Sequence, residues 1–477
     1  MRHILTLICL LWLGLMAQGQ EKPNLVLFLT DDLGREDISP YGEREIRTPN
    51  MQKLADAGLT FENAYVASPS CAPSRAALLT GLMPARNGAE ANHSKPRAEI
   101  KKWPAYLKES GYEVVAFGKV AHYKYTADYG FDHFEHDTFH DHAAIEAAVK
   151  YLENRSKTGS KPLCICVGSN WPHVPWPQEN AGYDASKLRL PAGSVETALT
   201  RDWRVKYASA VTRADDDLGR VMAAVNTHLG KNTCVLFTSD HGAQWPFGKW
   251  NCYESGIAVP MIVSWPGKVK PASRTKAWVS WVDILPTFVE VALGQTPKGL
   301  DGSSFHKVLL QPEATHRDRI FATHSGDGRW NVYPIRSLRS GNWKYIRNLH
   351  PEYAFTTHID LESRPEQRNF FASWELKAQS NPQARQILDR YHKRPPEELY
   401  DLSADPHEQN NLAMQPSGRE HLEKMRGELD RWMKEQGDRQ MVFAEPRLLS
   451  DPKSYGPGAP GGNVNKKGAG KKSSEKK

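Results

Sequence analysis

The residue most suited to chemistry is Cys71, which begins a predicted helix and is followed one turn later by Arg75. Unpaired backbone N–H groups and the helix dipole favour an anion at a helix start. Arg75 adds a planar donor fork that matches a carboxylate, phosphate or sulfate. This setting is expected to lower the pKa of the thiol and make it reactive. The alternative is a buried cysteine that packs as a small apolar side chain.

Four short apolar runs predict buried β-strands, at residues 24–29, 114–117, 163–167 and 234–238. They alternate with helical segments in the first half of the chain. This pattern is typical of an α/β fold, in which helices cover both faces of a mostly parallel sheet.

Polar residues follow each of the four predicted strands. These are Asp31 and Asp32, then Lys119 and His122, then His173, and finally Asp240 and His241. In open α/β sheets the carboxyl ends of the strands form the ligand crevice, so these side chains are expected to converge there. Any one group alone could be an ordinary cap or turn. Four groups at the same edge predict a site, which Cys71 and Arg75 join from a helix start.

The predicted site combines metal ligands with proton donors and acceptors. Carboxylates of Asp31, Asp32 and Asp240 suit a hard divalent cation. Such an ion would polarise a tetrahedral anionic group and stabilise the charge that grows during its hydrolysis. The oxygens of the anionic group that do not bind the metal are expected to contact two lysines, and two histidines are expected to act as acid and base. These four residues are Lys119, Lys249, His122 and His173.

Several motifs resemble those of the formylglycine-dependent (type I) sulfatases. The string C-A-P-S-R at 71–75, continued by L-L-T-G at 78–81, resembles the signature that maturation enzymes read. The aspartate pair, G-K-V-A-H at 118–122, D-H-G at 240–242 and the lysine-bearing loop at 248–256 resemble further motifs of that family. The likeness extends to about residue 440. It implies an alkaline-phosphatase/sulfatase-like fold, with a large mixed, mostly parallel sheet and a smaller C-terminal antiparallel sheet.

The resemblance also implies a mechanism. Cys71 would be oxidised to formylglycine by a formylglycine-generating or an anaerobic sulfatase-maturating enzyme, and one hydroxyl of its hydrate would attack sulfur. Asp240 would accept the proton of that hydroxyl, and His173 would protonate the leaving group. His122 would then deprotonate the second hydroxyl, which releases sulfate. Arg75 and Lys119 would orient the diol.

By the same resemblance a divalent metal binds at the predicted site. Its ligands would be Asp31, Asp32, residue 71, Asp240 and His241. Many sulfatases have asparagine in place of His241, and imidazole suits manganese or zinc better than calcium. Calcium is the expected ion, with manganese and magnesium as alternatives.

The substrate is predicted from the C-terminal third. Runs at 321–324, 333–339, 345–349 and 399–412 resemble heparan N-sulfatases, which act on N-sulfated glucosamine. This likeness makes His324 and Arg336 candidate substrate contacts, although His324 could equally be structural. The alternatives are an O-sulfatase on another sulfated polysaccharide or small ester, a phosphonate or phosphate monoester hydrolase, and an inactive glycan-binding homologue.

The two ends of the 477-residue chain differ in composition from the middle. Residues 1–19 have the charged start, apolar run and small-residue cleavage pattern of a signal peptide, which predicts a periplasmic or secreted protein without a membrane span. Residues 451–477 are predicted to be a disordered tail, because they are rich in glycine, proline and lysine.

Between these ends the chain is divided into a catalytic domain, 20–315, and a C-terminal subdomain, 316–450, with an antiparallel sheet and a helix near 420–436. The net charge is +7, but most of the excess lies in the tail, so nucleic-acid binding is not expected. Removal of Cys9 with the signal peptide leaves five of the six cysteines, which are predicted to be thiols rather than a disulfide framework.

Overall fold

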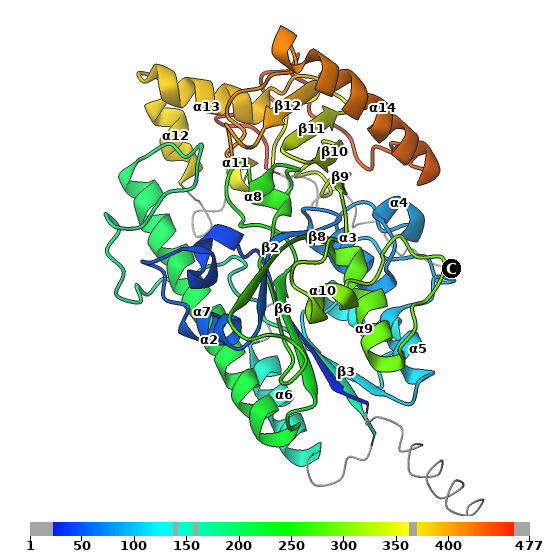
Figure 1. Ribbon diagram of the computed structural model, residues 1–477. Coiled ribbons are helices and arrows are strands. Elements are labelled where there is room, and N and C mark those ends of the chain that lie inside the picture. Colours follow the sequence, from blue (N-terminus) through cyan, green and yellow to red (C-terminus); the bar gives the residue numbers. More distant parts are fainter. Residues whose placement is uncertain (1–21, 137–141, 156–160, 362–369, 462–477) are drawn as a thin grey trace, which may run out of the picture.

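The computed structural model describes residues 22–136, 142–155, 161–361 and 370–461. It has a large α/β body and a smaller C-terminal part that lies above it in Figure 1. The predicted signal peptide and residues 462–477 of the predicted tail lie outside the described residues. Among the described helices, none is long and apolar enough to cross a membrane.

The body is built on an eight-stranded mixed sheet with the strand order β4-β3-β5-β1-β6-β7-β2-β8. Its strands are β1 (Asn24–Thr30), β2 (Leu59–Tyr65), β3 (Glu113–Gly118), β4 (His133–Glu135), β5 (Leu163–Gly168), β6 (Thr233–Ser239), β7 (Met261–Ser264) and β8 (Ser273–Ser280). The first five strands in this order, β4, β3, β5, β1 and β6, are parallel to one another. Strand β7 is antiparallel to both of its neighbours, and β8 is parallel to β2.

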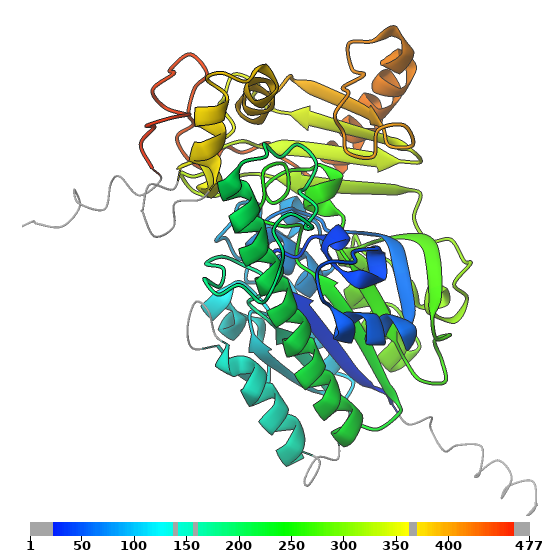
Figure 2. The same ribbon diagram turned by 90° about the vertical axis from the view of Figure 1, so that its left-hand side faces the viewer.

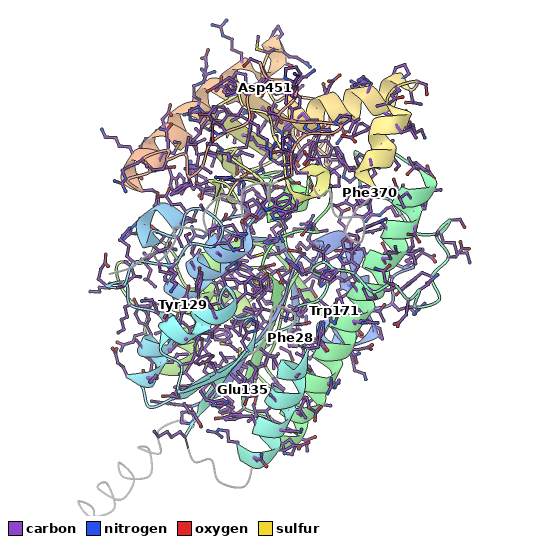
Figure 3. The ribbon with its side chains drawn as sticks, turned by 180° about the vertical axis from the view of Figure 1, so that it is seen from behind. Phe28, Tyr129, Glu135, Trp171, Phe370 and Asp451 are labelled. Carbon is purple, nitrogen blue, oxygen red and sulfur yellow. The ribbon has the colours of Figure 1, made fainter. Side chains whose placement is uncertain are left out.

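All four predicted strands are confirmed, as β1, β3, β5 and β6. Their residues are almost entirely buried, because helices cover both faces of the sheet and an uninterrupted apolar run can then face the core on both sides. The rings of Phe28 and Phe237 stack across β1 and β6 with centroids 6.2 Å apart. Figure 3 shows Phe28 in the middle of the body and Asp451 in the C-terminal part.

Two layers of helices enclose the sheet (Figures 1 and 2). One layer contains α2 (Pro49–Asp56), α6 (Ala143–Arg155) and the long α7 (Ala198–His228). The other contains α3 (Cys71–Thr80), α5 (Trp103–Lys108) and α9 (Ile284–Leu293). Shorter helices are α4 (Pro84–Asn87), α8 (Glu254–Ile257) and α10 (His306–Leu310). Apolar side chains of the sheet and both layers form one continuous core.

The C-terminal part contains a four-stranded antiparallel sheet in the order β12-β11-β10-β9. Its strands are β9 (Arg319–His324), β10 (Ile335–Ser340), β11 (Trp343–Asn348) and β12 (Glu397–Asp401). Its helices are α11 (His358–Leu361), α12 (Phe371–Lys377), α13 (Pro382–His392) and α14 (Arg419–Glu435). The apolar face of α14 packs on this sheet through Leu422, Met425 and Leu429. The predicted helix near 420–436 is therefore confirmed.

The fold is the predicted mixed, mostly parallel sheet between helices, followed by a smaller antiparallel sheet. Residues 451–461, which the composition assigns to a disordered tail, form turns instead. Arg447 donates to the carbonyl oxygen of Pro460 at 2.8 Å and also to that of Ser454, and the ring of Tyr455 lies 5.4 Å from that of His392. Glycine and proline serve here as turn formers that these contacts order.

Candidate active site

The predicted metal ligands converge at the carboxyl ends of two neighbouring strands. Asp31 and Asp32 directly follow β1, and Asp240 and His241 directly follow β6, whose last residue pairs with that of β1. Cys71 is the first residue of α3. All five side chains are buried, and their ligand atoms form two overlapping groups in which every atom lies within 4.8 Å of the others; His173 belongs to one of these groups. The structure therefore brings all five residues together.

His241 shows that this cluster fits a divalent cation. Its Nδ1 lies 3.0 Å from the carbonyl oxygen of Gly242, and because a carbonyl oxygen only accepts, Nδ1 carries the ring hydrogen. The lone pair of Nε2 is left on the side of the carboxylates, 3.4 Å from Asp32 and 3.6 Å from Asp240. Carboxylate oxygens and a nitrogen lone pair that face one point are a ligand set for Ca²⁺, Mg²⁺ or Mn²⁺.

Each carboxylate of the cluster also has a cationic partner. Lys119 pairs with Asp31, and Nζ of Lys249 lies 2.9 Å from both oxygens of Asp32. A third pair joins Nε of Arg75 to Oδ2 of Asp240 at 2.9 Å. These pairs compensate part of the cost of burying three acids together. Lys119, Lys249 and Arg75 thus lie where the sequence placed them.

The electrostatic environment differs between the two adjacent aspartates. Burial alone would raise the pKa of Asp31, but Lys119, His173 and Arg75 hold it well below its usual value. For Asp32, burial outweighs the attraction of Lys249, and the pKa is raised. A bound cation would favour the ionised form of both groups.

The thiol of Cys71 is buried within the cluster. Its Sγ lies 3.3 Å from Nε2 of His241 and 3.7 Å from both Asp31 and Lys119. Burial raises the pKa of the thiol well above its usual value, and this effect outweighs the opposing attraction of Lys119 and Lys249. Because the thiolate is the nucleophile, the unmodified cysteine is a poor one.

The two predicted catalytic histidines occupy different positions at the cluster. His173 follows β5, and its Nδ1 lies 2.6 Å from the carbonyl oxygen of Val174, so Nδ1 carries a hydrogen. Its Nε2 faces the cluster, 3.9 Å from Oδ2 of Asp32. His122 follows β3 and is buried; burial, Lys119 and His93 lower its pKa well below the usual value.

Several polar residues contact the site without having been predicted. Nζ of Lys119 donates to Oη of Tyr123 at 3.1 Å. The backbone N–H of Ala72, next to Cys71, donates to Oδ1 of Asn92 at 3.0 Å. His93 and Asp327 lie beyond His122. Tyr123 adjoins the G-K-V-A-H motif, whereas isolated polar residues in turns, such as the other three, carry no sequence signal of their role.

His324 and Arg336 are not part of this cluster, and their role as substrate contacts stays a prediction. His324, at the end of β9, is fully buried, and its Nε2 lies 2.8 Å from Oδ1 of Asn331. Arg336, on β10, is buried too, and it pairs through Nε and Nη2 with Asp438 and donates to the carbonyl oxygen of His324. Both side chains connect segments of the C-terminal part to one another.

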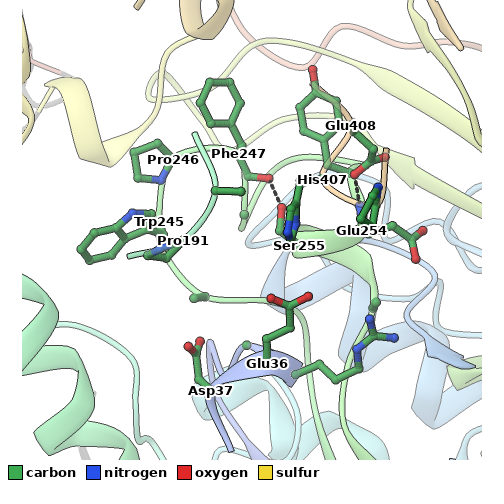
Figure 4. Close-up of a pocket in the computed structure, with 18 of the residues that line it drawn as sticks. Glu36, Asp37, Pro191, Trp245, Pro246, Phe247, Glu254, Ser255, His407 and Glu408 are labelled. Atoms are coloured by element: carbon green, nitrogen blue, oxygen red, sulfur yellow. Dashed lines mark hydrogen bonds between the residues drawn. The ribbon is translucent and has the colours of Figure 1, made fainter. Parts of the chain in front are cut away.

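A separate cavity lies at the junction of the body and the C-terminal part (Figure 4). Glu36 and Asp37 line it from the segment after β1, Trp245 and Phe247 from the loop after β6, and His407 and Glu408 from the loop after β12. Two hydrogen bonds join lining residues to one another, from Ser255 to the carbonyl oxygen of Phe247 and from the N–H of Glu254 to Glu408. The residues of the metal cluster do not line this cavity.

The fold places a buried cluster that could hold a metal ion at the carboxyl ends of parallel strands, and comparison with known proteins identifies the family. The family model named Sulfatase matches residues 23–294, more than half of the chain. A second model, the C-terminal region of N-sulphoglucosamine sulphohydrolase, matches residues 241–394. The chain belongs to the sulfatase family and is a hydrolase of sulfate esters or sulfamates.

Two relatives show how far the likeness extends. An ulvan-active sulfatase from Formosa agariphila is 32% identical over 440 residues, covering 88% of this chain and 81% of the relative. The human N-sulphoglucosamine sulphohydrolase is 27% identical over 480 residues, covering 90% and 93%. Both alignments include the body and the C-terminal part.

Solved structures confirm the fold. A protein in complex with its substrate D-glucosamine-2-N,6-O-disulfate has a TM-score of 0.65 at 20% identity, covering 88% of this chain and 99% of the other. A structure from glycosaminoglycan metabolism in Bacteroides thetaiotaomicron has a TM-score of 0.69 at 20% identity, covering 88% and 97%. The sulfatase-like α/β fold predicted from the sequence is therefore confirmed.

Proposed function

We propose that the chain is an exported sulfatase that removes sulfate from a sulfated saccharide with a formylglycine at position 71 and a divalent metal. The observation that carries this proposal is the buried convergence of three carboxylates and Nε2 of His241 on the first residue of α3. Asp31, Asp32, Asp240 and His241 would hold the metal, with the oxidised residue 71 beside it. Calcium is the expected ion.

The metal would supply Lewis-acid stabilisation of the sulfate oxygens, and the formylglycine would supply the nucleophilic hydroxyl. The remaining work falls to side chains of this chain. Lys119 and Lys249 place two positive charges at the cluster, where they would neutralise a sulfate. His173 presents Nε2 to the cluster, as a general acid for the leaving group requires. His122 would serve as the general base.

The raised pKa of Cys71 supports the need for oxidation. A buried thiol that stays protonated is a poor nucleophile, whereas a hydrated aldehyde at the same position can be activated by a neighbouring base. Peptide mass analysis of protein produced with a maturating enzyme tests this step. Thiol alone at residue 71 in an active preparation would contradict it.

N-sulfated glucosamine is the first substrate candidate. It is supported by the match of residues 241–394 to the C-terminal model of N-sulphoglucosamine sulphohydrolase and by the 93% coverage of the human enzyme. The predicted contacts His324 and Arg336 add no support from geometry, because both side chains are buried and make hydrogen bonds within the protein. An O-sulfated polysaccharide is the second candidate, supported by the 32% identity to an ulvan-active sulfatase.

A panel of defined substrates separates these candidates. Glucosamine N-sulfate, its 6-O-sulfated isomer, ulvan oligosaccharides, nitrophenyl sulfate and nitrophenyl phosphate would be incubated with matured enzyme, and free sulfate or phosphate measured. Preferred release from the N-sulfated sugar supports the first candidate, and release from ulvan or the 6-O-sulfated sugar supports the second. Preference for the phosphate ester, or saccharide binding without turnover, would overturn the proposed function.

Export rests on residues 1–19, whose pattern predicts cleavage near residue 20. N-terminal mass analysis of the protein recovered from the periplasm or medium tests it. A protein that stays in the cytoplasm and retains Met1 or Arg2 would contradict it.

A further inference from the structure

A chain of three side chains leads from the active site to the C-terminal part. Nε2 of His122 lies 2.8 Å from Nδ1 of His93, and Nε2 of His93 lies 3.2 Å from Oδ1 of Asp327. The two imidazole rings meet edge to face with their centroids 4.7 Å apart. The three residues come from different segments, after β3, after α4 and after β9.

Asp327 is held as a carboxylate. Its side chain is 3% exposed, and Oδ2 accepts hydrogen bonds from Nε1 of Trp250 at 2.8 Å and from Nδ2 of Asn92 at 3.0 Å. These two donors leave Oδ1 on the side of His93. Burial alone would raise the pKa of Asp327, but His93, His358 and Asn92 hold it well below its usual value.

The carboxylate determines which nitrogen of each histidine carries the hydrogen. Oδ1 of Asp327 has no hydrogen-bond donor among the residues that the structure describes, and its contact with His93 at 3.2 Å is an ion-pair distance. A lone pair on Nε2 of His93 would face this negative oxygen, so Nε2 carries the hydrogen. In neutral His93 the other nitrogen, Nδ1, is then an acceptor, and Nε2 of His122 must donate to it. In neutral His122 the lone pair is therefore on Nδ1. This atom is buried and has no hydrogen-bond partner among the residues that the structure describes.

The backbone around His93 supports a fixed arrangement. His93 has φ 63°, a left-handed conformation that is uncommon for a residue other than glycine. The preceding residue, Asn92, makes three hydrogen bonds. It accepts from the N–H of Ala72 and donates to the carboxylate of Asp327 and to the carbonyl oxygen of Gly326. These bonds position His93, although its side chain is 57% exposed. Unusual backbone conformations held by such contacts are frequent at functional sites.

We propose that His93 and Asp327 are positioning residues that hold His122 in the Nε2–H form, so that Nδ1 is the atom with which His122 takes a proton. The inference rests on the proposed function, in which His122 is the general base. In that step the O–H bond of the second hydroxyl of the formylglycine hydrate breaks and an N–H bond forms at Nδ1 of His122. The resulting imidazolium of His122 is separated from the negative charge of Asp327 by the ring of His93. Asp327 would stabilise that charge through His93 without itself taking a proton.

The substitution Asp327→Asn tests this arrangement because it replaces the negative oxygen that faces His93 by a hydrogen-bond donor. Trp250 and Asn92 would hold the new amide oxygen in the place of Oδ2, and the NH₂ group would then face His93. His93 would have to accept at Nε2 and donate from Nδ1, which forces His122 to accept at Nε2 and carry its hydrogen on Nδ1. The equivalent exchange in the serine-protease triad lowers kcat roughly 10⁴-fold through the wrong tautomer.

We expect Asp327→Asn to lower kcat about 10²- to 10⁴-fold on the preferred substrate of the panel and to change KM less than about threefold. Glu352→Gln is a matched control, because Glu352 also accepts from a histidine, His350, at 2.9 Å but at an exposed position of the C-terminal part. It should leave kcat unchanged. Equal kcat values for Asp327→Asn and the unmutated enzyme would overturn the proposal.

A second readout does not depend on catalysis. ¹⁵N imidazole spectra of full-length Cys71→Ala protein at pH 8 report which nitrogen of His122 carries the hydrogen, with the signal assigned by its loss in His122→Gln. We expect hydrogen on Nε2, and on Nδ1 after Asp327→Asn is added. Hydrogen on Nδ1 in the Cys71→Ala protein itself, or no change after the exchange, would overturn the relay even if turnover falls.

Variants of His93 separate a loss of catalysis from a loss of folding. This side chain is half-exposed, so its removal is expected to leave the melting temperature nearly unchanged. Asn at this position keeps an acceptor where Nδ1 stands, so His93→Asn should retain much more kcat than His93→Leu. Equal losses would overturn the proposal. A protein that hydrolyses none of the panel would refute the proposed function, while the spectra would still decide the tautomer.

Discussion

The catalytic cluster and the Arg336–Asp438 pair both bury opposite charges, but they differ in whether lone pairs remain available for a ligand. Arg336 and Asp438 contact each other through two nitrogens and two oxygens, and the pair is closed. In the cluster, Nε2 of His241 keeps its lone pair, and the carboxylates of Asp32 and Asp240 approach the same point. Buried charge alone therefore does not indicate a site. Ligand atoms that remain available and converge do.

The two regions also differ in how the fold assembles them. The cluster stands at the ends of parallel strands β1 and β6, where every neighbouring strand delivers its following residue to the same edge. The Arg336–Asp438 pair joins an antiparallel strand to the segment after α14 and holds the C-terminal part together. Substitutions in the first region should affect turnover, and those in the second should affect stability.

The largest effect is expected at residue 71. Cys71→Ala should lower sulfate release at least about 10⁴-fold, because the proposed nucleophile is lost, and should change the melting temperature by only a few degrees. The control is Cys234→Ala, another buried thiol, in β6 and outside the cluster, which should keep most activity. Residual turnover above about 1% in Cys71→Ala would contradict the assignment.

Removal of the metal should be nearly as severe. Without a cation the carboxylates of Asp31, Asp32 and Asp240 repel one another, so exhaustive chelation should lower both turnover and melting temperature. Asp32→Asn should lower turnover about 10³-fold and also weaken metal retention. Elemental analysis measures the ion and distinguishes calcium from manganese. Full turnover in protein shown to be metal-free would refute the metal site.

His173→Ala should have an effect that depends on the leaving group. If His173 is the general acid, a sugar leaving group needs its proton and a nitrophenolate does not. We expect a loss of about 10²- to 10³-fold on the preferred sulfated sugar and less than about tenfold on nitrophenyl sulfate, measured as kcat. Equal losses on both substrates would remove His173 from this role.

Breaking the closed pair should cost stability and little else. Asp438→Asn leaves the guanidinium of Arg336 without its carboxylate in a buried position, which should lower the free energy of unfolding by about 3 kcal/mol. Denaturant unfolding measures this loss, and KM for the substrate should stay within about twofold. A raised KM without a loss of stability would support Arg336 as a substrate contact.

The smallest effect concerns Glu408 at the junction cavity. Burial raises its pKa to about 8, an effect that Lys344 only partly opposes. The folded protein therefore binds a proton there more tightly than the unfolded chain, so stability falls as pH rises from about 5 to 8. Glu408→Gln should remove most of this fall, measured by unfolding at both pH values. A pH dependence identical to that of the unmutated protein would show that Glu408 is ionised throughout.

Local sequence patterns were sufficient for the strands and for most of the site. A strand buried on both faces is an uninterrupted apolar run, and the polar residues that follow it can only lie at the sheet edge. For this reason Asp31, Asp32, Asp240 and His241 could be predicted to meet although the two pairs are far apart in the chain. The helix start at Cys71 was equally local, as was the amphipathic helix that became α14.

The identity of hydrogen-bond partners was decided by the tertiary structure alone. Whether Arg336 meets a saccharide or Asp438 depends on how the segment after α14 returns to β10, and no local pattern encodes that return. The same holds for His93 and Asp327. In the sequence they are single polar residues in turns, and they meet only because the C-terminal part packs on the body. The pKa of Cys71 follows this rule too. A helix start lowers it locally, but complete burial, a property of the folded chain, raises it by more, so the net change is upward.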